Sequence, residues 1–330
     1  MMIQTVTGPV DVNDLGRTLV HEHLYVSFPG AELDPKATFD RPAFVAEAVR
    51  RLTQLRVEHG VRTFVDPCPM EMGRDVRLMA EVSEKAQMNI VCCTGFYTEA
   101  RGLPSYWRNS TVEQIAELYI HELERGVGDT GIRAGAIKCA SEGQPTMTEG
   151  EAKCFAAASI AQQATGVSII THTHAGLGGP EQQDVFERHG VPLHRALIGH
   201  CCGSSDRAYH RSIAGRGSYV GFDRIGLTHF QKDEVRADCL VDLFRAGHSH
   251  RILMSQDHWC ALRGRHGSPS DEAAIKAAAT QANNPWGPGF THLFTTFVPM
   301  LLERGLKQEE IFALLDENPR RFFAGGPSGA

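Results

Sequence analysis

The chain has 330 residues, of which 42% are hydrophobic and 22% are charged, a composition typical of globular proteins and unlike that of disordered chains. Its formal net charge of −6 and its pI of about 6.2 come without any block of basic residues, which excludes nucleic acid as an expected partner. No apolar run reaches the roughly 18 residues of a membrane-spanning helix, so we expect no membrane partner.

Eight short runs rich in β-branched and apolar residues predict strands. Each run is almost continuously apolar rather than alternating, which is typical of strands that are covered on both faces of a sheet. In chain order the predicted strands are Thr18–His23, Thr63–Pro67, Asn89–Thr94, Arg133–Lys138, Val167–His172, Arg195–His200, Ser218–Asp223 and Arg251–Asp257.

Helical patterns lie between the predicted strands, with apolar residues spaced three and four apart. Several of these patterns end at a glycine, as at Gly60 and Gly166, which favours a helix C-cap. We expect the last helix of the chain to end at Glu317–Pro319. The other predicted helices are Arg41–Glu58, Val112–Arg125, Glu149–Thr165, Gly179–His189, Asp206–Ala214, Lys232–Ala246 and Thr291–Arg304.

Alternation of eight strands with helices over 330 residues predicts one domain, residues 1–330, with the (β/α)8 TIM-barrel fold of the α/β class. The alternative is a doubly wound sheet, but no Gly-x-Gly-x-x-Gly loop follows the first predicted strand. The longest irregular stretch, His258–Phe290, follows the eighth predicted strand. We therefore expect it on the active-site face of the barrel.

The cysteines and the N-terminus predict a cytoplasmic protein. Nine cysteines, an odd number, occur without any Cys-x-x-Cys pair, and many of them lie within apolar runs. We therefore expect reduced, buried cysteines rather than disulfides or a thiolate zinc site. The first residues of the chain lack the basic and apolar regions of a secretory signal.

Metal-binding residue types stand at the carboxyl ends of four predicted strands. In a TIM barrel these ends converge on one site, and residues two apart in a strand face the same side. Each histidine alone is more often a hydrogen-bonded core or surface residue, but several candidates at one end favour a metal site. Imidazole and carboxylate ligands suit Zn²⁺, Mn²⁺, Co²⁺ or Fe²⁺. Five ligands exceed the need of one tetrahedral ion, which predicts two ions held by His21, His23, His172, His200 and Asp257.

Lys138 ends the fourth predicted strand, and two interpretations of it are open. It is either a lysine that extends out of the barrel end, or a member of the metal site. Burial beside two divalent cations would favour its neutral amine. A neutral amine can react with CO₂ to give a carbamate, which is an anionic group able to bridge two metal ions.

Six residues together resemble the metal-ligand set of the phosphotriesterase family in the amidohydrolase superfamily: His21, His23, Lys138, His172, His200 and Asp257. The resemblance covers nearly the whole chain, and it implies a homodimeric (β/α)8 hydrolase. The buried ion would be bound by His21, His23 and Asp257. The exposed ion would be bound by His172 and His200. Carboxylation of the Lys138 Nζ atom would let this residue bridge the two ions together with a hydroxide.

Within that family the chain is more similar to the phosphotriesterase-like lactonases than to the dedicated organophosphate hydrolases. Tyr97 falls where those lactonases carry a tyrosine near the exposed metal, and Arg224 falls where they carry an arginine in the seventh loop. The resemblance implies a small-molecule lactone or ester as substrate, such as an N-acyl-homoserine lactone in quorum quenching, with promiscuous cleavage of organophosphate triesters. Tyr97 would orient the carbonyl group. Asp257 would pass the hydroxide proton to the leaving alkoxide.

Other assignments stay open at this point. A dedicated phosphotriesterase, a carboxylesterase or an amidase would use the same metal site. Arg224 is either part of the active site or a structural ion-pair partner. A catalytically silent metal-binding protein would lack a ligand or the proton carrier, and this chain has all six positions. The sequence assigns no role to four further polar or aromatic residues near the ligands: His174, His258, Trp259 and Cys260.

Overall fold

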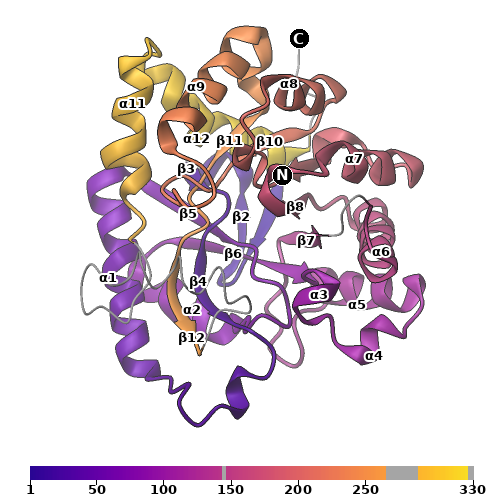
Figure 1. Ribbon diagram of the computed structural model, residues 1–330. Coiled ribbons are helices and arrows are strands. Elements are labelled where there is room, and N and C mark those ends of the chain that lie inside the picture. The colour runs from indigo at the N-terminus through magenta and orange to yellow at the C-terminus, as the bar shows by residue number, and fades with distance from the viewer. Residues whose placement is uncertain (143–145, 265–288, 326–330) are drawn as a thin grey trace.

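The computed structural model describes residues 1–142, 146–264 and 289–325 of the chain. Every predicted strand overlaps one strand of a single parallel sheet, which curves into a nearly closed barrel (Figure 1). The TIM barrel is confirmed and the doubly wound alternative is excluded. In their order across the sheet, the strands are β11 (Ile252–Met254), β10 (Tyr219–Phe222), β9 (Ala196–Ile198), β8 (Ile169–Thr173), β7 (Ala136–Ser141), β6 (Asn89–Gly95), β5 (Val61–Asp66) and β3 (Arg17–Leu19).

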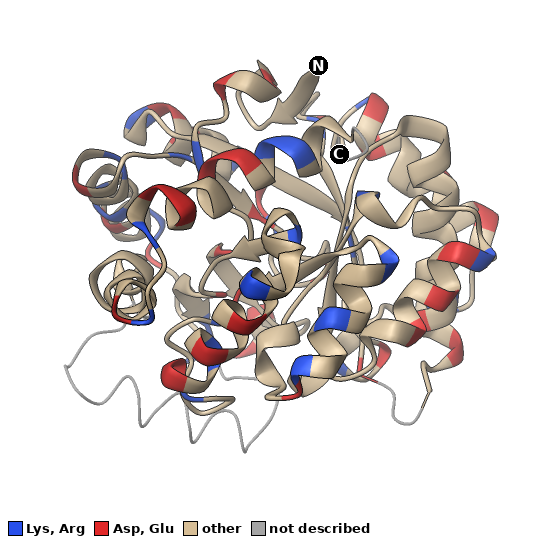
Figure 2. Ribbon diagram, turned by 90° about the horizontal axis from the view of Figure 1, so that it is seen from above, with Lys and Arg blue, Asp and Glu red and all other residues tan. Residues whose placement is uncertain are grey.

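Helices surround the barrel, and several of them begin at a side-chain cap and end at a glycine. Asp40 accepts a hydrogen bond from Ala43 N at the start of the first helix, and Gly60 ends that helix in a left-handed conformation. Charged residues of both signs lie along these outer helices (Figure 2). The helices are α1 (Arg41–His59), α2 (Val76–Ala86), α3 (Glu99–Gly102), α4 (Ser105–Arg108), α5 (Val112–Glu124), α6 (Glu149–Thr165), α7 (Gly179–Arg188), α8 (Arg207–Arg216), α9 (Asp233–Leu243), α11 (Val298–Glu303) and α12 (Gln308–Ala324).

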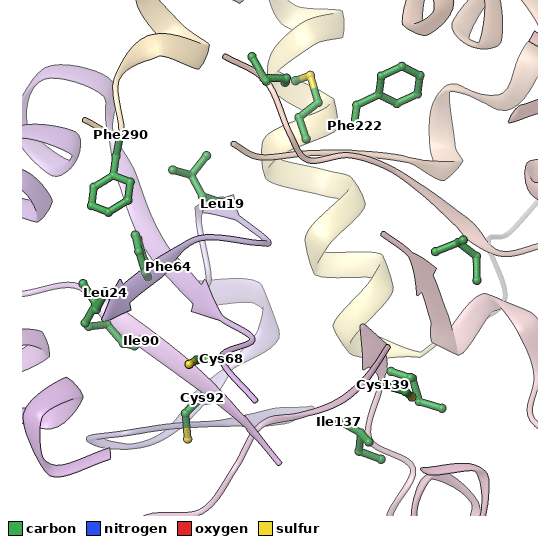
Figure 3. Close-up of a cluster of buried hydrophobic side chains, with 14 of the residues drawn as sticks. Leu19, Leu24, Phe64, Cys68, Ile90, Cys92, Ile137, Cys139, Phe222 and Phe290 are labelled. Atoms are coloured by element: carbon green, nitrogen blue, oxygen red, sulfur yellow. The ribbon is translucent and has the colours of Figure 1, made fainter. Parts of the chain in front are cut away.

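The core has two layers, because each barrel strand buries both of its faces. The outer layer lies between strands and helices and contains Leu19, Phe64 and Ile137 (Figure 3). The inner layer fills the barrel itself and takes one or two side chains from successive strands. Its members on the strands are Val65, Val91, Cys93, Ala136, Ile170, Leu197, Tyr219 and Leu253.

The amino end of the barrel is covered by two segments from opposite ends of the chain. Strands β1 (Met2–Thr5) and β2 (Gly8–Asp11) form an antiparallel hairpin, whose Ile3 packs on the inner layer. Phe322 and Phe323 of α12 join the same cluster. The prediction that the last helix ends at Glu317–Pro319 is wrong, because α12 continues through Pro319 to Ala324.

The carboxyl end of the barrel differs from the prediction at two strands. The predicted strand Thr18–His23 is too long, because the backbone leaves the sheet after Leu19 and Glu22 N bonds instead to Val65 O. His23 begins a separate strand, β4 (His23–Ser27), which pairs in parallel with β12 (Trp259–Arg263). Lys138 lies within β7 rather than at its end, since pairing with β8 continues through Ser141.

The loop after the eighth barrel strand is only partly described. Strand β12 occupies the start of the predicted irregular stretch His258–Phe290, whereas residues 265–288 lie outside the described residues. In the parts of the chain that the structure describes, no helix has the length and apolar character needed to cross a membrane. The nine cysteines are all free and buried, as predicted.

Candidate metal centre

The six predicted ligands converge at the carboxyl end of the barrel and line one cavity. They come from five places in the sheet, so the barrel fold rather than local sequence brings them together. His21 lies between β3 and β4, His23 is the first residue of β4, Lys138 lies in β7, His172 in β8, His200 two residues after β9, and Asp257 three residues after β11.

Asp257 is at the centre of the group. Its Oδ1 atom lies 3.2 Å from His23 Nε2 and 3.7 Å from His21 Nε2, while its Oδ2 atom lies 3.7 Å from His200 Nε2. The ring of His172 meets the ring of His200 edge-on, with 4.6 Å between the ring centroids. The carboxylate therefore has one oxygen facing each half of the site.

Two aspartates behind the histidines set the orientation of three imidazoles. The Nδ1 atoms of His21 and His200 each lie 3.0 Å from an oxygen of Asp223, and His23 Nδ1 lies 3.0 Å from Asp66 Oδ1. A carboxylate in this position accepts a hydrogen bond from Nδ1–H and so favours the tautomer whose Nε2 lone pair faces the cavity, as in many metal-binding histidines. Sequence reasoning missed Asp66 and Asp223 as site residues, although each comes at the end of a predicted strand.

The donor set fits a divalent cation. With Nδ1–H groups directed outward, the Nε2 lone pairs of His21, His23 and His200 point toward the acceptor oxygens of Asp257. Lone pairs that face one another at such distances are stabilised by positive charge between them, supplied by a proton or by a divalent metal ion. At His23 a proton meets this demand when no metal ion is bound: burial lowers the pKa of the imidazole, but hydrogen bonds to Asp257 and Asp66 outweigh burial and raise the pKa well above its ordinary value.

Lys138 belongs to the buried site and does not extend out of the barrel. Its side chain is almost fully buried, and its Nζ atom lies 3.1 Å from His21 Nε2. Burial lowers the pKa of Lys138, although the carboxylate of Asp257 opposes this shift. Burial also lowers the pKa of His21 to about 3, with the positive charge of Lys138 adding to the effect. Both shifts are in the direction of the neutral forms, which are the forms that bind metal or react with CO₂.

Two of the candidate ligands occupy strained backbone positions. His200 has φ 62° and Asp257 has φ 53°, in the left-handed region that L-residues rarely adopt. Such strain tends to occur at functional sites, where the surrounding structure compensates for it. Close packing around Lys138 adds a further constraint, because a Cβ atom on Gly95 would overlap Lys138 O.

Tyr97 and Arg224 also lie at the cavity. Arg224 Nε donates to Asp257 Oδ2 at 2.9 Å, and its guanidinium lies 4.1 Å from the centroid of the Phe230 ring. Tyr97 Oη lies 3.4 Å from His172 Nδ1, and burial raises the pKa of this phenol, so it stays a proton donor. The backbone N–H of Tyr97 donates to Glu71 Oε1 at 2.7 Å, which fixes the residue at the cavity wall.

The cavity has a polar rim and an apolar wall. On the rim, Arg101 and His174 both bind Glu142, and the His174 side chain is 46% exposed. Trp259 of β12 lines the wall, whereas neither His258 nor Cys260 borders the cavity. Both of those side chains are buried. The apolar lining includes Val26, Phe28, Met72, Leu227, Phe230, Trp259 and Leu262.

Nearly the whole chain is similar in sequence to known proteins. The Phosphotriesterase family model matches residues 1–323. A phosphotriesterase homology protein of Mycobacterium tuberculosis is 33% identical over 330 residues, with 97% of each chain covered. An aryldialkylphosphatase of Saccharolobus solfataricus is 33% identical and covers 96% of this chain and 97% of its own.

Solved structures with the same fold come from Deinococcus radiodurans. An organophosphorus hydrolase has a TM-score of 0.88 at 35% identity, covering 98% of this chain and 97% of its own. A mutant of a PTE-like lactonase has a TM-score of 0.88 at 35% identity, covering 97% of this chain and 99% of its own.

Proposed function

Because this chain belongs to the phosphotriesterase family of binuclear metal hydrolases, we propose that it is a lactonase with a weaker organophosphate triesterase activity. The observation that carries this proposal is the pairing of Tyr97 beside His172 with Arg224 on Asp257, in a cavity that has one apolar wall. A structural neighbour described as a PTE-like lactonase supports it.

The proposed cofactor is a pair of divalent ions, with zinc as the first choice and cobalt, manganese or iron as the others. His21, His23 and Asp257 would hold one ion. His172 and His200 would hold the other. Lys138, carboxylated on Nζ, would contribute to both. When bound, the ions would polarise the substrate carbonyl and lower the pKa of a water molecule to near neutrality.

The residues of this chain would then divide the remaining tasks. The apolar wall would receive an acyl chain, and the hydroxyl group of Tyr97 would donate a hydrogen bond that orients the lactone. Asp257 would accept the proton of the attacking water and pass it to the leaving alkoxide, so that the ring opens. Arg224 would keep the carboxylate of Asp257 ionised and correctly turned through the 2.9 Å hydrogen bond.

The same proposal extends to the protein as a whole. Residues 1–330 would form one catalytic domain that acts as a cytoplasmic homodimer. Its substrates would be N-acyl-homoserine lactones or related γ- and δ-lactones, and its role would be the degradation of quorum signals. Light scattering of the purified protein would show twice the chain mass of 36.2 kDa if the dimer forms.

The deciding experiment is a substrate panel with enzyme loaded with Zn²⁺, Co²⁺ or Mn²⁺. We expect kcat/KM for the best lactone to exceed that for a paraoxon-type triester by about 100-fold, which corresponds to about 2.7 kcal/mol. Asp257→Asn serves as the control and should lower kcat by roughly 10²–10⁴-fold while the protein stays folded. Faster cleavage of the triester, of simple carboxylesters or of amides would replace the lactonase with the corresponding alternative.

A further inference from the structure

Glu22 lies between the two histidines of the His-x-His segment, but its carboxylate turns away from them. The residue is fully buried and does not line the cavity. Its Oε1 atom accepts hydrogen bonds from Ser255 Oγ at 2.8 Å and from Gln256 N at 2.8 Å. Its Oε2 atom accepts from His258 N at 3.0 Å. One carboxylate thus holds the backbone N–H groups on both sides of Asp257.

Asp257 needs such support because its backbone is in the left-handed region, with φ 53°. That conformation costs an L-residue about 1–2 kcal/mol, so an unrestrained loop would relax to another one. Relaxation would rotate the Cα–Cβ bond of Asp257 and move its carboxylate away from His23 and Arg224. The hydrogen bonds of Glu22 oppose this rotation, because both flanking peptide groups are fixed to a single rigid group.

Backbone contacts complete the attachment of the two segments. Asp257 N donates to His21 O at 3.0 Å, and His23 N donates to His258 O at 2.7 Å. Ser255 Oγ accepts a hydrogen bond from His21 N at 3.0 Å and donates one to Glu22 Oε1 at 2.8 Å. The end of the first barrel strand and the end of the eighth are therefore joined around Glu22, where the barrel closes.

We propose that Glu22 is a positioning residue that sets the place of the Asp257 carboxylate for proton transfer, without touching the substrate. This inference rests on the proposed function, since it assumes that Asp257 carries the proton in a hydrolytic reaction. It assigns the middle residue of the His-x-His segment a role separate from metal binding. A displacement of about 1 Å at a reacting group can lower a rate about 100-fold, which sets the scale of the expected effect.

The first variant is Glu22→Gln, which keeps the shape of the side chain. Every partner of the carboxylate donates a hydrogen bond, so the new amide NH₂ group must face a donor. We expect kcat to fall about 10–100-fold and KM to change by less than about threefold. Ser255→Ala removes one bond to the same carboxylate and should lower kcat about 3–10-fold. It also serves as the test if Glu22→Gln fails to fold.

The matched control is Glu122→Gln. Glu122 is a buried carboxylate that binds Arg74 at 2.6 Å and does not line the cavity. Its substitution should lower thermal stability and leave kcat within about twofold. If Glu22→Gln loses activity and Glu122→Gln does not, the loss does not come from general destabilisation.

A double-mutant cycle separates positioning from a structural role. If Glu22 acts through Asp257, Glu22→Gln should have almost no effect on the residual kcat of Asp257→Asn, because the group that it positions is already absent. At saturating metal the metal content should stay near that of the wild type, because the other five candidate ligands are unchanged, and a crystal structure of the variant should show the Asp257 carboxylate displaced. These two readouts do not depend on activity.

Three results would overturn the inference. They are unchanged kcat in both Glu22→Gln and Ser255→Ala, equal losses in the wild-type and Asp257→Asn backgrounds, or loss of metal in proportion to activity. A wild-type enzyme that hydrolyses no lactone, ester or triester with any metal would instead contradict the proposed function itself. The two failures are thus distinguishable in one set of assays.

Discussion

Asp223 and Asp66 both orient imidazoles of the candidate site, but they differ in how many imidazoles they contact. Asp223 binds one imidazole on each side of the site, because its two oxygens receive His21 Nδ1 and His200 Nδ1. Asp66 binds a single imidazole, that of His23, and uses its other oxygen for Leu24 N. The two carboxylates therefore differ in how many ligands depend on them.

This difference predicts unequal effects on metal binding. Asp66→Asn should lower the affinity for one ion by roughly 10–100-fold, whereas Asp223→Asn should lower the affinity for both ions by similar factors. The amide would no longer fix the Nδ1–H tautomer of the bound imidazoles. Equilibrium dialysis followed by metal analysis would measure both affinities. Selective loss of a single ion from Asp223→Asn would contradict the shared role.

Lys138 provides the second prediction at this scale. Lys138→Ala should lose bound metal and activity, because no anionic bridge can form, and short carboxylic acids should restore part of both. Metal content and lactone turnover would be measured with and without added propionate. The control is Lys153→Ala on α6, whose side chain donates to Arg108 O near the surface. A fully metallated, active Lys138→Ala enzyme would disprove the carbamate bridge.

Glu71 predicts a pH effect on stability. Burial raises its pKa to about 7, from an ordinary value of 4.5. Between these values the folded protein binds more protons than the unfolded chain, so this group lowers stability as pH rises. Glu71→Gln lacks this titrating group. The unfolding free energy of the variant minus that of the wild type should therefore rise by roughly 1–3 kcal/mol from pH 5 to pH 8.

Urea denaturation at several pH values would measure this difference. Glu149→Gln is the control, since Glu149 is 88% exposed and should give parallel curves for variant and wild type. Parallel curves for Glu71→Gln as well would show that the carboxyl group does not resist ionisation in the folded state.

At the scale of elements, the eight barrel strands could be predicted from sequence, but strand ends and the helix α2 between β5 and β6 could not. The apolar run through Val20 looks continuous up to His21, yet the backbone leaves the sheet after Leu19. The cause is the contact of this segment with residues 255–258, which are more than 230 positions away in the chain. Local propensity carries no information about such a contact.

The candidate ligands were accessible to prediction because each follows an apolar run, whereas their supports were not. Glu22 has no local signal that separates it from an exposed glutamate. Asp66 and Asp223 end predicted strands, so their positions carried a signal, but their partners come from other strands. Residues that act through a second residue are visible only when the fold is known.

Asn318 joins helix α12 to the barrel. Asn318 is buried, and its Nδ2 atom donates to Ser249 O and Ile252 O, each at 2.8 Å, at the start of β11. Asn318→Ala would leave both carbonyl groups without this donor and should lower the unfolding free energy by about 1–3 kcal/mol.

The midpoint of urea unfolding would report the loss. Glu317→Gln, at an exposed neighbouring position that pairs with Arg321, is the control and should change stability by less than about 0.5 kcal/mol. An unchanged midpoint in Asn318→Ala would show that these two hydrogen bonds do not anchor the helix to the barrel.

At the scale of the whole molecule, the six candidate ligands connect strands on opposite sides of the barrel. A ligand that binds only the folded protein stabilises it in proportion to the logarithm of its concentration, by about 4 kcal/mol at 1,000 times its Kd. Removal of metal with a chelator should therefore lower Tm by several degrees, and added Zn²⁺ should restore it. Scanning calorimetry would measure the shift. Added Zn²⁺ should restore less of the Tm in the variant His172→Ala.

If Zn²⁺ leaves the Tm of the chelated protein unchanged, the cluster does not bind metal in the folded state. Magnesium at the same concentration is the matched control, because imidazole-rich sites bind it weakly and it should restore little of the Tm.

The covered amino end of the barrel restricts how substrate and product can enter and leave the protein. The β1–β2 hairpin and the two phenylalanines of α12 fill that end, and the inner apolar layer separates it from the cavity. In the part of the barrel that the structure describes, this leaves the carboxyl end as the route for both substrate and product. A hydrolysed molecule has to leave before the next one can enter, so the accumulated product of this enzyme competes directly with its substrate.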